Sequence, residues 1–330
     1  MDIHKPENLS WVARMNALGK ESIPFVFLLD FDLTTPIVWT MDEIPDDVLY
    51  KINQFKNYTL SGKIHKTLDF KKLPVQINEY SISFKKIMDE LNYGNTFLIN
   101  LTFPTEITTN FSLRELFNVS HAKYKLFFKD EFIVSSPESF IQIKNNVIRT
   151  FPMKGTIDAG IKNAKKIILN DLKETAEHYT IVDLLRNDLS MVADRVKVKR
   201  FRFIDKLNTS NKVLYQVSSE IEGQLEPNYS WRLGDIFAAI LPAGSISGAP
   251  KKKTVDIIKQ NEMLPRGFYT GVFGIFDGKN VDSGVMIRFI EKDGEKMYYR
   301  SGCGITHLSD MYSEYCEMID KVYVPVSRNH

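Results

Sequence analysis

The stretch SPESFIQIKNNVIRTFPMKGT, residues 136–156, is the part of the sequence that best indicates the fold. Its middle holds two runs of alternating apolar and polar residues, 140–144 and 147–151, with an Asn-Asn pair between them. Alternating runs around such a pair are typical of a β-hairpin. Because a hairpin brings its two ends together, we expect Glu138 and Lys154 to face one small volume.

The residues after Lys154 fit a binding site at the end of this hairpin. Gly155 allows a ligand to approach the backbone closely, and Thr156 offers a hydroxyl group. The alternative is a solvated glutamate and lysine beside a turn. The hairpin alone favours this alternative, because the chain contains 43 lysines and arginines and most such side chains are solvated.

The composition is that of an ordinary globular protein. The chain has 330 residues, of which 43% are hydrophobic and 25% are charged, so it can bury a large core as one domain or two. Its net charge of +2 is spread along the sequence without a long basic run. This argues against nucleic acid or a membrane surface as the main partner.

The sequence also predicts a cytoplasmic protein. Residues 1–20 lack the continuous apolar core of a signal peptide, and no stretch approaches the roughly 18 apolar residues that span a bilayer. Cys303 and Cys316 offer neither a metal-binding spacing nor a disulfide framework, which fits a reducing compartment.

The N-terminal part is predicted to form sheet structure. Residues 23–29 and 36–39 have the composition of two strands joined by a turn. A basic and polar stretch follows. We therefore expect a β-rich N-terminal segment over 1–75 that packs on a core domain over 76–330.

The first part of the core domain is predicted to contain a helix and two strands. Apolar residues at helical spacing indicate a helix over 81–93 that ends at Gly94. Strands are expected over 97–103 and 125–134, and the second leads directly into the 136–156 stretch.

Two helices are predicted to carry paired glutamates. Asn170 or Asp171 is expected to cap a helix that presents Glu174 and Glu177 on one face. Its predicted apolar stripe is formed by Leu172, Ala176, Tyr179, Val182, Leu185 and Leu189.

The second of these helices lies near the C-terminus. Ser309 is expected to cap it, and Glu314 and Glu317 repeat the spacing of the first pair. Its predicted apolar side is formed by Met311, Tyr315, Met318 and Val322. If the two pairs converge, they form an all-oxygen site of the kind that magnesium prefers and zinc does not. The alternative is that both pairs lie on solvated helix faces.

Residues 241–253, LPAGSISGAPKKK, predict a loop of small residues that opens a helix near Pro250. Lys251, Lys252 and Lys253 oppose the helix dipole at about 0.3–1 kcal/mol each, and an anion held by the loop amides would offset that cost. The spacing differs from that of a P-loop, so nucleotide binding is not supported. A flexible loop with a solvated lysine face explains the same residues equally well.

Residues 269–277, 281–291 and 296–301 predict a three-stranded meander with Asp-Gly turns. Arg288 lies inside the apolar middle strand, where it either reaches an edge or meets an anion such as a carboxylate. The Gly-Cys-Gly sequence at 302–304 either forms a tight bend or lets backbone N–H groups cradle a second carboxylate.

Four stretches occur in an order that points to a known family. They are PMKGT at 152–156, AEH at 176–178 leading into IVDLLRNDL at 181–189, GSISGAPK at 244–251, and SEY at 313–315 with Glu317 and Lys321. With them the chain resembles the chorismate-utilising enzymes over residues 80–325, and within that family it is most similar to component I of aminodeoxychorismate synthase.

The resemblance implies an α+β fold, an anthranilate synthase component I-like four-layer α/β/β/α core with two orthogonally packed β-sheets. Residues 76–330 would then be the chorismate-binding catalytic domain. The resemblance also implies an Mg²⁺ ion, with Glu177 and Glu317 as direct ligands and with Glu174 and Glu314 acting through water.

The resemblance further implies which residues bind the two carboxylates of chorismate. The positions that hold the pyruvyl carboxylate correspond to Tyr269, Arg288 and the backbone amides of Gly302 and Gly304. The positions near the ring carboxylate correspond to Ser247 and Lys321.

Two positions bear on the nucleophile that enters. Leu98 stands where isochorismate and salicylate synthases carry a water-activating lysine, and Lys154 stands where anthranilate synthases carry an alanine. In the similar aminodeoxychorismate enzymes this lysine attacks C2, the C4 hydroxyl leaves with a proton from the glutamate matched by Glu138, and ammonia enters at C4. A free lysine is neutral only about once in 2,500 molecules at pH 7, so the site has to favour the neutral amine.

Ammonia is expected from a glutamine amidotransferase subunit on a separate chain, as in family relatives, because Ile305 breaks the G-x-C-x-G elbow that Cys303 would need. The implied activity is the synthesis of aminodeoxychorismate for para-aminobenzoate and folate. The alternatives are an anthranilate synthase component I and, from another class, a noncatalytic homologue that binds magnesium or a dicarboxylate.

The sequence departs from the family pattern at several positions. Gln216 stands where many relatives have a histidine near the C4 leaving group, and Cys303 replaces a glycine of the carboxylate cradle. Ala243 and Ser247 are smaller changes, from a glycine and a threonine. The short N-terminal region matches poorly, so nothing here supports the tryptophan pocket of larger relatives.

Overall fold

The computed structural model describes residues 10–59, 66–208 and 213–326. The chain divides into two compact units, each assembled from three separate stretches. Unit 1 consists of Met1–Ile44, Glu138–Ser245 and Gly271–Val285, and unit 2 consists of Pro45–Pro137, Ile246–Thr270 and Met286–His330. The domain boundary predicted near residue 75 stays a prediction.

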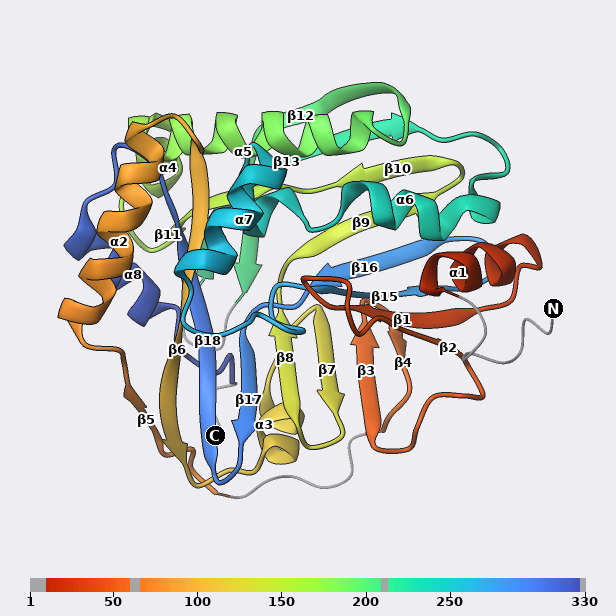
Figure 1. Cartoon of the computed structure of the whole chain (residues 1–330), viewed down its shortest axis with the longest axis horizontal. Helices are drawn as coiled ribbons and strands as arrows, with labels where there is room; N and C mark the ends of the chain where they lie inside the picture. The colour runs from red at the N-terminus through yellow and green to blue at the C-terminus, as the bar shows by residue number, and fades with distance from the viewer. Residues whose placement is uncertain (1–9, 60–65, 209–212, 327–330) are drawn as a thin grey trace. The chain divides into compact units, whose positions relative to one another are not determined.

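Each unit contains one antiparallel sheet, and the two sheets share no strand. Among the described residues, the sheet of unit 1 has nine strands in the order β11-β13-β10-β9-β16-β15-β1-β2, with β12 paired to the other side of β13 (Figure 1). The strands are β1 Phe25–Leu29, β2 Ile37–Thr40, β9 Ser139–Lys144, β10 Val147–Thr150, β11 Met153–Asp158, β12 Asp194–Asn208, β13 Val213–Gln224, β15 Val272–Phe276 and β16 Val281–Val285.

The hairpin predicted from the 136–156 stretch is confirmed. Strands β9 and β10 pair antiparallel with Lys144 opposite Val147. Asn145 and Asn146 have φ of +53° and +60°, as a two-residue type I′ turn requires at both positions. The first two predicted strands also form, and β1 and β2 pair with each other.

The helices of unit 1 pack beside this sheet. They are α1 Trp11–Lys20, α4 Ala164–Asn170, α5 Leu172–Ser190 and α6 Leu233–Ile240, with the short 3₁₀ helix η2 Tyr229–Arg232. Helix α5 contacts β11, β12 and β13, and it begins at the predicted cap, where the Asp171 carboxylate accepts a hydrogen bond from the backbone N–H of Glu174. The long helix therefore lies against the strands that follow the hairpin.

The predicted apolar stripe of α5 is wrong in the first half of the helix. Leu172 and Tyr179 are 85% and 58% exposed, and Ala176 is exposed as well. Of the side chains described in this half, the buried one is His178, which lies four residues before the buried Val182. The prediction counted only apolar residues and therefore missed His178. A histidine can be buried when its ring has a hydrogen-bond partner.

The sheet of unit 2 also has nine strands among the described residues, in the order β14-β6-β18-β17-β8-β7-β3-β4 with β5 paired to β6. The strands are β3 Val48–Ile52, β4 Phe55–Lys56, β5 Phe70–Leu73, β6 Leu98–Thr109, β7 Tyr124–Phe128, β8 Phe132–Ser136, β14 Gly248–Ala249, β17 Phe289–Asp293 and β18 Lys296–Ile305. The helices are α2 Ile77–Asn92, α3 Leu113–Val119, α7 Lys251–Asn261 and α8 Met311–Asp320. The short 3₁₀ helix η3, Gly244–Ile246, leads from unit 1 into unit 2.

Several predictions for unit 2 need correction. The strand predicted over 125–134 is the hairpin β7–β8, whose turn places Lys129 and Asp130 at positive φ. Helix α2 starts earlier than predicted, but it ends before Gly94 at φ +77°, as expected. Helix α8 is capped by Asp310 and not by Ser309, because the Asp310 carboxylate accepts from the N–H of Ser313.

The three-stranded meander predicted over 269–301 is wrong. Its middle strand is two strands, β16 and β17, which belong to different sheets. Arg288 lies between them with a backbone φ of +52°, which residues other than glycine rarely adopt. The apolar pattern continues through the change of sheet because Val285 and Met286 are both buried, so periodicity could not reveal it.

Four of the predicted site residues lie within a few residues of the points where the chain passes from one unit to the other. These residues are Glu138, Ser247, Tyr269 and Arg288. The predicted α+β class is confirmed by two antiparallel sheets with accompanying helices. In the described part of the chain, no helix is both long enough and apolar enough to cross a membrane.

Candidate active site

A bulge in β11 sets the geometry around Lys154. Met153 pairs with Ser218 and Thr156 with Gln216, so Lys154 and Gly155 together oppose a single residue of β13. Gly155 has φ of +80°, which only glycine adopts without strain. A bulge of this kind redirects a side chain away from the regular alternation of the strand.

The redirected side chain of Lys154 reaches the first half of α5. Its Nζ lies 2.6 Å from Oε2 of Glu177, and the two side chains are 29% and 14% exposed. The sequence had predicted a nucleophile and a metal ligand, and the structure joins these two residues in one ion pair.

Glu174 lies beside the same bulge. A Cβ atom placed on Gly155 would stand 3.1 Å from Oε2 of Glu174, so the absent side chain leaves room for this carboxylate. The two glutamates of α5 therefore share a face of the helix, as their spacing predicted, and in the structure this face lies toward β11. Thr156, the next residue of the strand, is exposed.

His178 anchors α5 to the sheet. It is 1% exposed, and its Nε2 lies 2.7 Å from Oγ of Ser219 on β13, which also accepts a hydrogen bond from the N–H of Arg202. Burial, with a smaller contribution from the positive charge of Arg202, lowers the pKa of His178 to about 4. The histidine is therefore neutral near pH 7 and holds the helix that presents Glu177.

Glu138 stands at the start of β9, where its side chain has a partner that the sequence analysis did not identify. The hydroxyl of Ser245 donates a hydrogen bond of 2.9 Å to Oε1 of Glu138. The expectation that Glu138 and Lys154 face one small volume stays a prediction.

In unit 2, three arginines lie near the buried Tyr269. Burial raises the pKa of its phenol to about 12, and the neighbouring positive charges of Arg266, Arg300 and Arg288 act in the opposite direction. The guanidinium of Arg300 lies over the Tyr269 ring at 5.4 Å and also forms an ion pair of 3.0 Å with Glu291.

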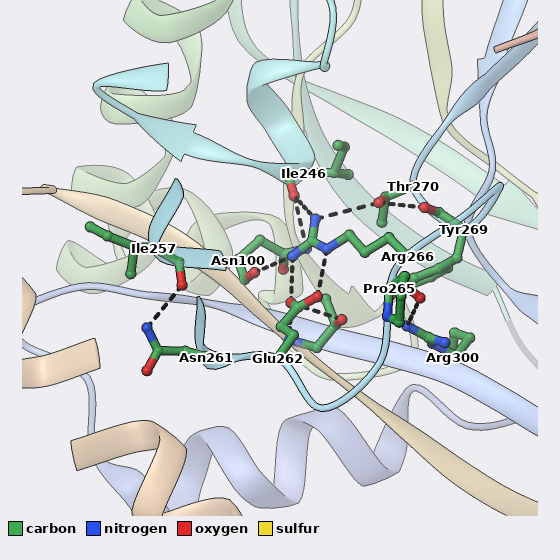
Figure 2. A network of polar contacts seen from close by, with 11 residues as sticks. Asn100, Ile246, Ile257, Asn261, Glu262, Pro265, Arg266, Tyr269, Thr270 and Arg300 are labelled. Atoms are coloured by element: carbon green, nitrogen blue, oxygen red, sulfur yellow. Dashed lines mark hydrogen bonds and ion pairs between the residues drawn. The ribbon is translucent and has the colours of Figure 1, made fainter. Parts of the chain in front are cut away.

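Arg266 is held by a network of hydrogen bonds, which Figure 2 shows. Its Nε and Nη2 donate to the two carboxylate oxygens of Glu262 at 2.8 and 2.6 Å. Its remaining hydrogen bonds reach the carbonyls of Ile246 and Asn100 and the hydroxyl of Thr270. This network holds the backbone on either side of the predicted substrate-binding residues.

Arg288 differs from the other two arginines. Its guanidinium lies 5.1 Å from the centre of the Tyr323 ring, and no carboxylate among the described residues forms an ion pair with it. Its Nε is buried without a hydrogen-bond acceptor in the described part of the chain. Nε of Arg300 also has no acceptor there, but Arg300 is already paired with Glu291. Of the three arginines, Arg288 is thus the one that forms no ion pair with a described carboxylate, and its planar fork suits an incoming one.

The two predicted cradle glycines lie within β18, so the alternative of a tight bend is wrong. A Cβ on Gly302 would stand 2.5 Å from the carbonyl oxygen of Leu101, and one on Gly304 would stand 3.2 Å from the side chain of Leu98. Lys321 donates to the carbonyl of Gly302 at 2.9 Å. Carboxylate binding by these glycines stays a prediction.

The second pair of glutamates lies on α8. Glu317 forms an ion pair of 2.8 Å with Lys321. Glu314 is buried and its carbonyl accepts from the thiol of Cys303, whose pKa is raised to about 12 by burial. Ser247 is fully buried, and its carbonyl accepts from the N–H of Asn100.

The predicted metal ligands thus fall into two pairs, one in each unit. Within the residues that the structure describes, no group of three or more histidine, cysteine, aspartate or glutamate side chains is gathered as a metal site requires. Magnesium binding by the four glutamates stays a prediction. Their oxygen atoms remain the donors that a hard cation prefers.

Comparison with known proteins assigns the family. A family model described as chorismate binding enzyme matches residues 50–327. The chain belongs to the chorismate binding enzyme family. The resemblance inferred from the four sequence stretches is therefore confirmed, and the protein is a member of a family of enzymes that act on chorismate.

Individual relatives extend this comparison. The chain is 47% identical over 319 residues to an uncharacterized PabA-like protein of Pasteurella multocida (strain Pm70), covering 96% of this chain and 98% of that protein. It is 31% identical over 267 residues to aminodeoxychorismate synthase component 1 of Bacillus subtilis (strain 168), covering 76% of this chain and 55% of that protein. The chain thus spans about half the length of that synthase component.

A solved structure confirms the fold of this chorismate binding enzyme. Anthranilate synthase component I from Streptococcus pneumoniae TIGR4 is similar with a TM-score of 0.65 and 26% sequence identity. The similarity covers 78% of this chain and 59% of that one. The fold class expected from the resemblance, that of anthranilate synthase component I, is correct.

Proposed function

We propose that this chorismate binding enzyme is component I of an aminodeoxychorismate synthase. It would replace the C4 hydroxyl of chorismate by ammonia received from a glutamine amidotransferase on a separate chain, and so serve para-aminobenzoate and folate synthesis in the cytoplasm. The observation that carries the proposal is the amine of Lys154, which a glycine bulge turns toward Glu177. The similarity to the Bacillus subtilis synthase component supports it.

Two displacements account for the chemistry. In the first, the neutral amine of Lys154 attacks C2, the ring double bonds shift, and the C4–O bond breaks as Glu138 gives its proton to the departing hydroxyl, which leaves as water. In the second, ammonia attacks C4, the double bonds shift back, and the bond between C2 and the lysine nitrogen breaks. The lysine is regenerated, and the product is 4-amino-4-deoxychorismate.

The ion pair has a direct consequence for the first displacement. While Lys154 is paired with Glu177 it is an ammonium ion without a lone pair, so the proton has to leave and the contact has to loosen before attack. The partial exposure of both side chains permits this change. A lysine is suited to the role because its amine can lose a proton at accessible pH, whereas an arginine cannot.

Magnesium belongs to the same proposal. Glu177 and Glu317 would be direct ligands, and Glu174 and Glu314 would act through water. The donors are all carboxylate oxygens, and Gly155 leaves room for the carboxylate of Glu174 at the bulge, so the residues present fit a hard cation. When bound, magnesium would neutralise negative charge on the substrate carboxylate.

The ligand assignment is tested by titrating magnesium against the rate of chorismate consumption. Glu317→Gln is expected to weaken magnesium binding at least about tenfold, because it removes a charged ligand oxygen. Glu295→Gln, which changes an exposed glutamate of unit 2, should leave the magnesium dependence unchanged and serves as the control. An unaltered dependence in Glu317→Gln would contradict the assignment.

The proposed activity is tested by identifying the product formed from chorismate, magnesium and an ammonium salt. The expected product is 4-amino-4-deoxychorismate. Anthranilate would show that the enzyme is an anthranilate synthase component I, and unconsumed chorismate would show a noncatalytic binding protein. Glutamine should replace ammonium only after a glutamine amidotransferase chain is added.

A further inference from the structure

Helix α5 carries a second buried acid near its other end. Asp188 is 3% exposed and follows the apolar residues Leu184 and Leu185 on the side of the helix that faces the interior. A carboxylate in such a place is costly unless hydrogen bonds compensate for the lost water. The groups that hydrogen-bond to Asp188 therefore indicate its role.

Asp188 accepts a hydrogen bond from the backbone of Gly244. The N–H of Gly244 donates to Oδ2 of Asp188 at 3.2 Å. A Cβ on Gly244 would stand 2.8 Å from that oxygen and 2.8 Å from Cγ of Leu184. The loop backbone thus lies directly on the helix, and no side chain fits between them.

The next residue of this loop reaches Glu138. Ser245 donates from its hydroxyl to Oε1 of Glu138 at 2.9 Å, and the backbone carbonyl of Glu138 accepts from the N–H of Val285. Ser245 therefore orients the side chain of Glu138, and Asp188 holds Gly244, the residue before Ser245.

We propose that Asp188 is a positioning residue for Glu138, acting through the Gly244 backbone and the Ser245 hydroxyl. The proposal rests on the proposed function, in which Glu138 protonates the C4 hydroxyl. Asp188 is buried, and its proposed role is to hold this support. Helix α5 then serves both reactive groups, because Glu177 pairs with Lys154 near one end and Asp188 fixes the support of Glu138 near the other.

The expected effect follows from the distance over which a proton is transferred. A general acid has to lie about 2.6–3.2 Å from the atom it protonates, and a displacement of about 1 Å lowers the rate roughly 100-fold. Asp188→Leu and Ser245→Ala should therefore each lower kcat about 10- to 100-fold and change KM for chorismate less than about twofold. Asp188→Asn, whose amide oxygen still accepts from Gly244, should retain most of the rate.

A merely structural role for Asp188 is separated by a double-mutant cycle with Glu138→Gln. If Asp188 acts through Glu138, Asp188→Leu and Ser245→Ala lose their effect on kcat in the Glu138→Gln protein. Equal losses in both backgrounds would overturn the proposal. Ser245→Ala keeps the test valid if Asp188→Leu fails to fold, because it removes only a hydroxyl.

A second readout does not depend on the reaction. In a second cycle with Glu138→Leu, which removes the acceptor of the Ser245 hydroxyl, the fall in Tm of each double variant should be smaller than the sum of the two single falls, since one chain of contacts is broken twice. Additive falls in Tm would overturn the proposal even if the enzyme makes another product or none. Failure of the proposed function would instead appear as a different product, or as unconsumed chorismate, from the unaltered protein.

Discussion

Two ion pairs in this enzyme, Arg266 with Glu262 and Lys154 with Glu177, differ in burial and in the type of cation. Arg266 and Glu262 in unit 2 are 1% and 4% exposed and meet through two parallel hydrogen bonds. Lys154 and Glu177 in unit 1 are partly exposed, at 29% and 14%, and meet with Nζ 2.6 Å from Oε2. The buried Arg266–Glu262 pair is expected to stay intact, whereas the partly exposed Lys154–Glu177 pair can separate.

The difference shows what each pair is suited to do. A planar guanidinium bonded to a carboxylate through two atoms is rigid and always charged, so it holds loops in place. A lysine amine on a flexible chain can lose its proton and move, so it can react. Burial and the type of cation together distinguish a structural pair from one available for chemistry.

The largest expected effect is on turnover at Lys154. Lys154→Ala should lower the rate of aminodeoxychorismate formation about 10,000-fold, or about 5 kcal/mol of transition-state stabilisation, because the nucleophile is removed. The Tm should change little, since the pair is partly exposed. Lys154→Arg, which can keep the ion pair with Glu177 but cannot attack, should be equally inactive. Normal turnover in either variant would remove the covalent role.

The next effect is on stability at Arg266. Arg266→Met should lower the free energy of unfolding by about 3–5 kcal/mol, because it leaves the buried carboxylate of Glu262 without its cation. Chemical denaturation measures the loss. Adding Glu262→Leu should restore much of the stability, since no buried charge then remains. A single variant as stable as the unaltered protein would show that this pair is not the structural element described here.

A buried cation that forms no ion pair with a carboxylate in the described part of the chain extends the comparison. Lys125 on β7 is buried over the ring of Phe117, and burial, with repulsion from Lys51, lowers its pKa to about 8. The folded state therefore binds fewer protons than the unfolded chain between pH 8 and 10.5, and stability should rise with pH across this window.

The corresponding variant is Lys125→Met. At pH 7 it should be more stable than the unaltered protein by up to about 3 kcal/mol, which is the cost of the buried charge. The advantage should shrink as the pH approaches 10, where the unaltered lysine is neutral when folded. Unfolding by denaturant at pH 7 and pH 10 measures both values, and a constant difference would refute the assignment.

The smallest effect is expected where the cation itself is exposed. The side chain of Lys199 on β12 is 43% exposed and lies 3.1 Å from Glu220 and 3.2 Å from Glu222. Lys199→Ala should shift the Tm by less than about 2 °C, and 1 M salt should abolish the shift. A large, salt-independent fall would show that exposure does not separate the pairs as proposed.

Local features of the fold were predictable from the sequence, whereas long-range ones were not. The β9–β10 hairpin and the cap of α5 depend on neighbouring residues, and both formed as expected. The change of sheet at Arg288 depends on partners far along the chain, and the apolar pattern does not record them.

The candidate site divides in the same way. The motifs identified Lys154 and Glu177, and the structure adds that they pair. The network around Arg266 and the buried Asp188 were missed, because a charged residue in a sequence is expected at the surface until its partners are known. Glycines close to these motifs were the available signal, since Gly155 and Gly244 each leave room for a carboxylate.

The most direct test of the central claim is the mass of the protein after rapid acid quenching during turnover with chorismate and magnesium. The account predicts an adduct on Lys154 that adds the mass of chorismic acid minus one water, located by peptide mapping and absent from Lys154→Ala. Product formation with no adduct, or with an adduct on another residue, would contradict attack by this lysine.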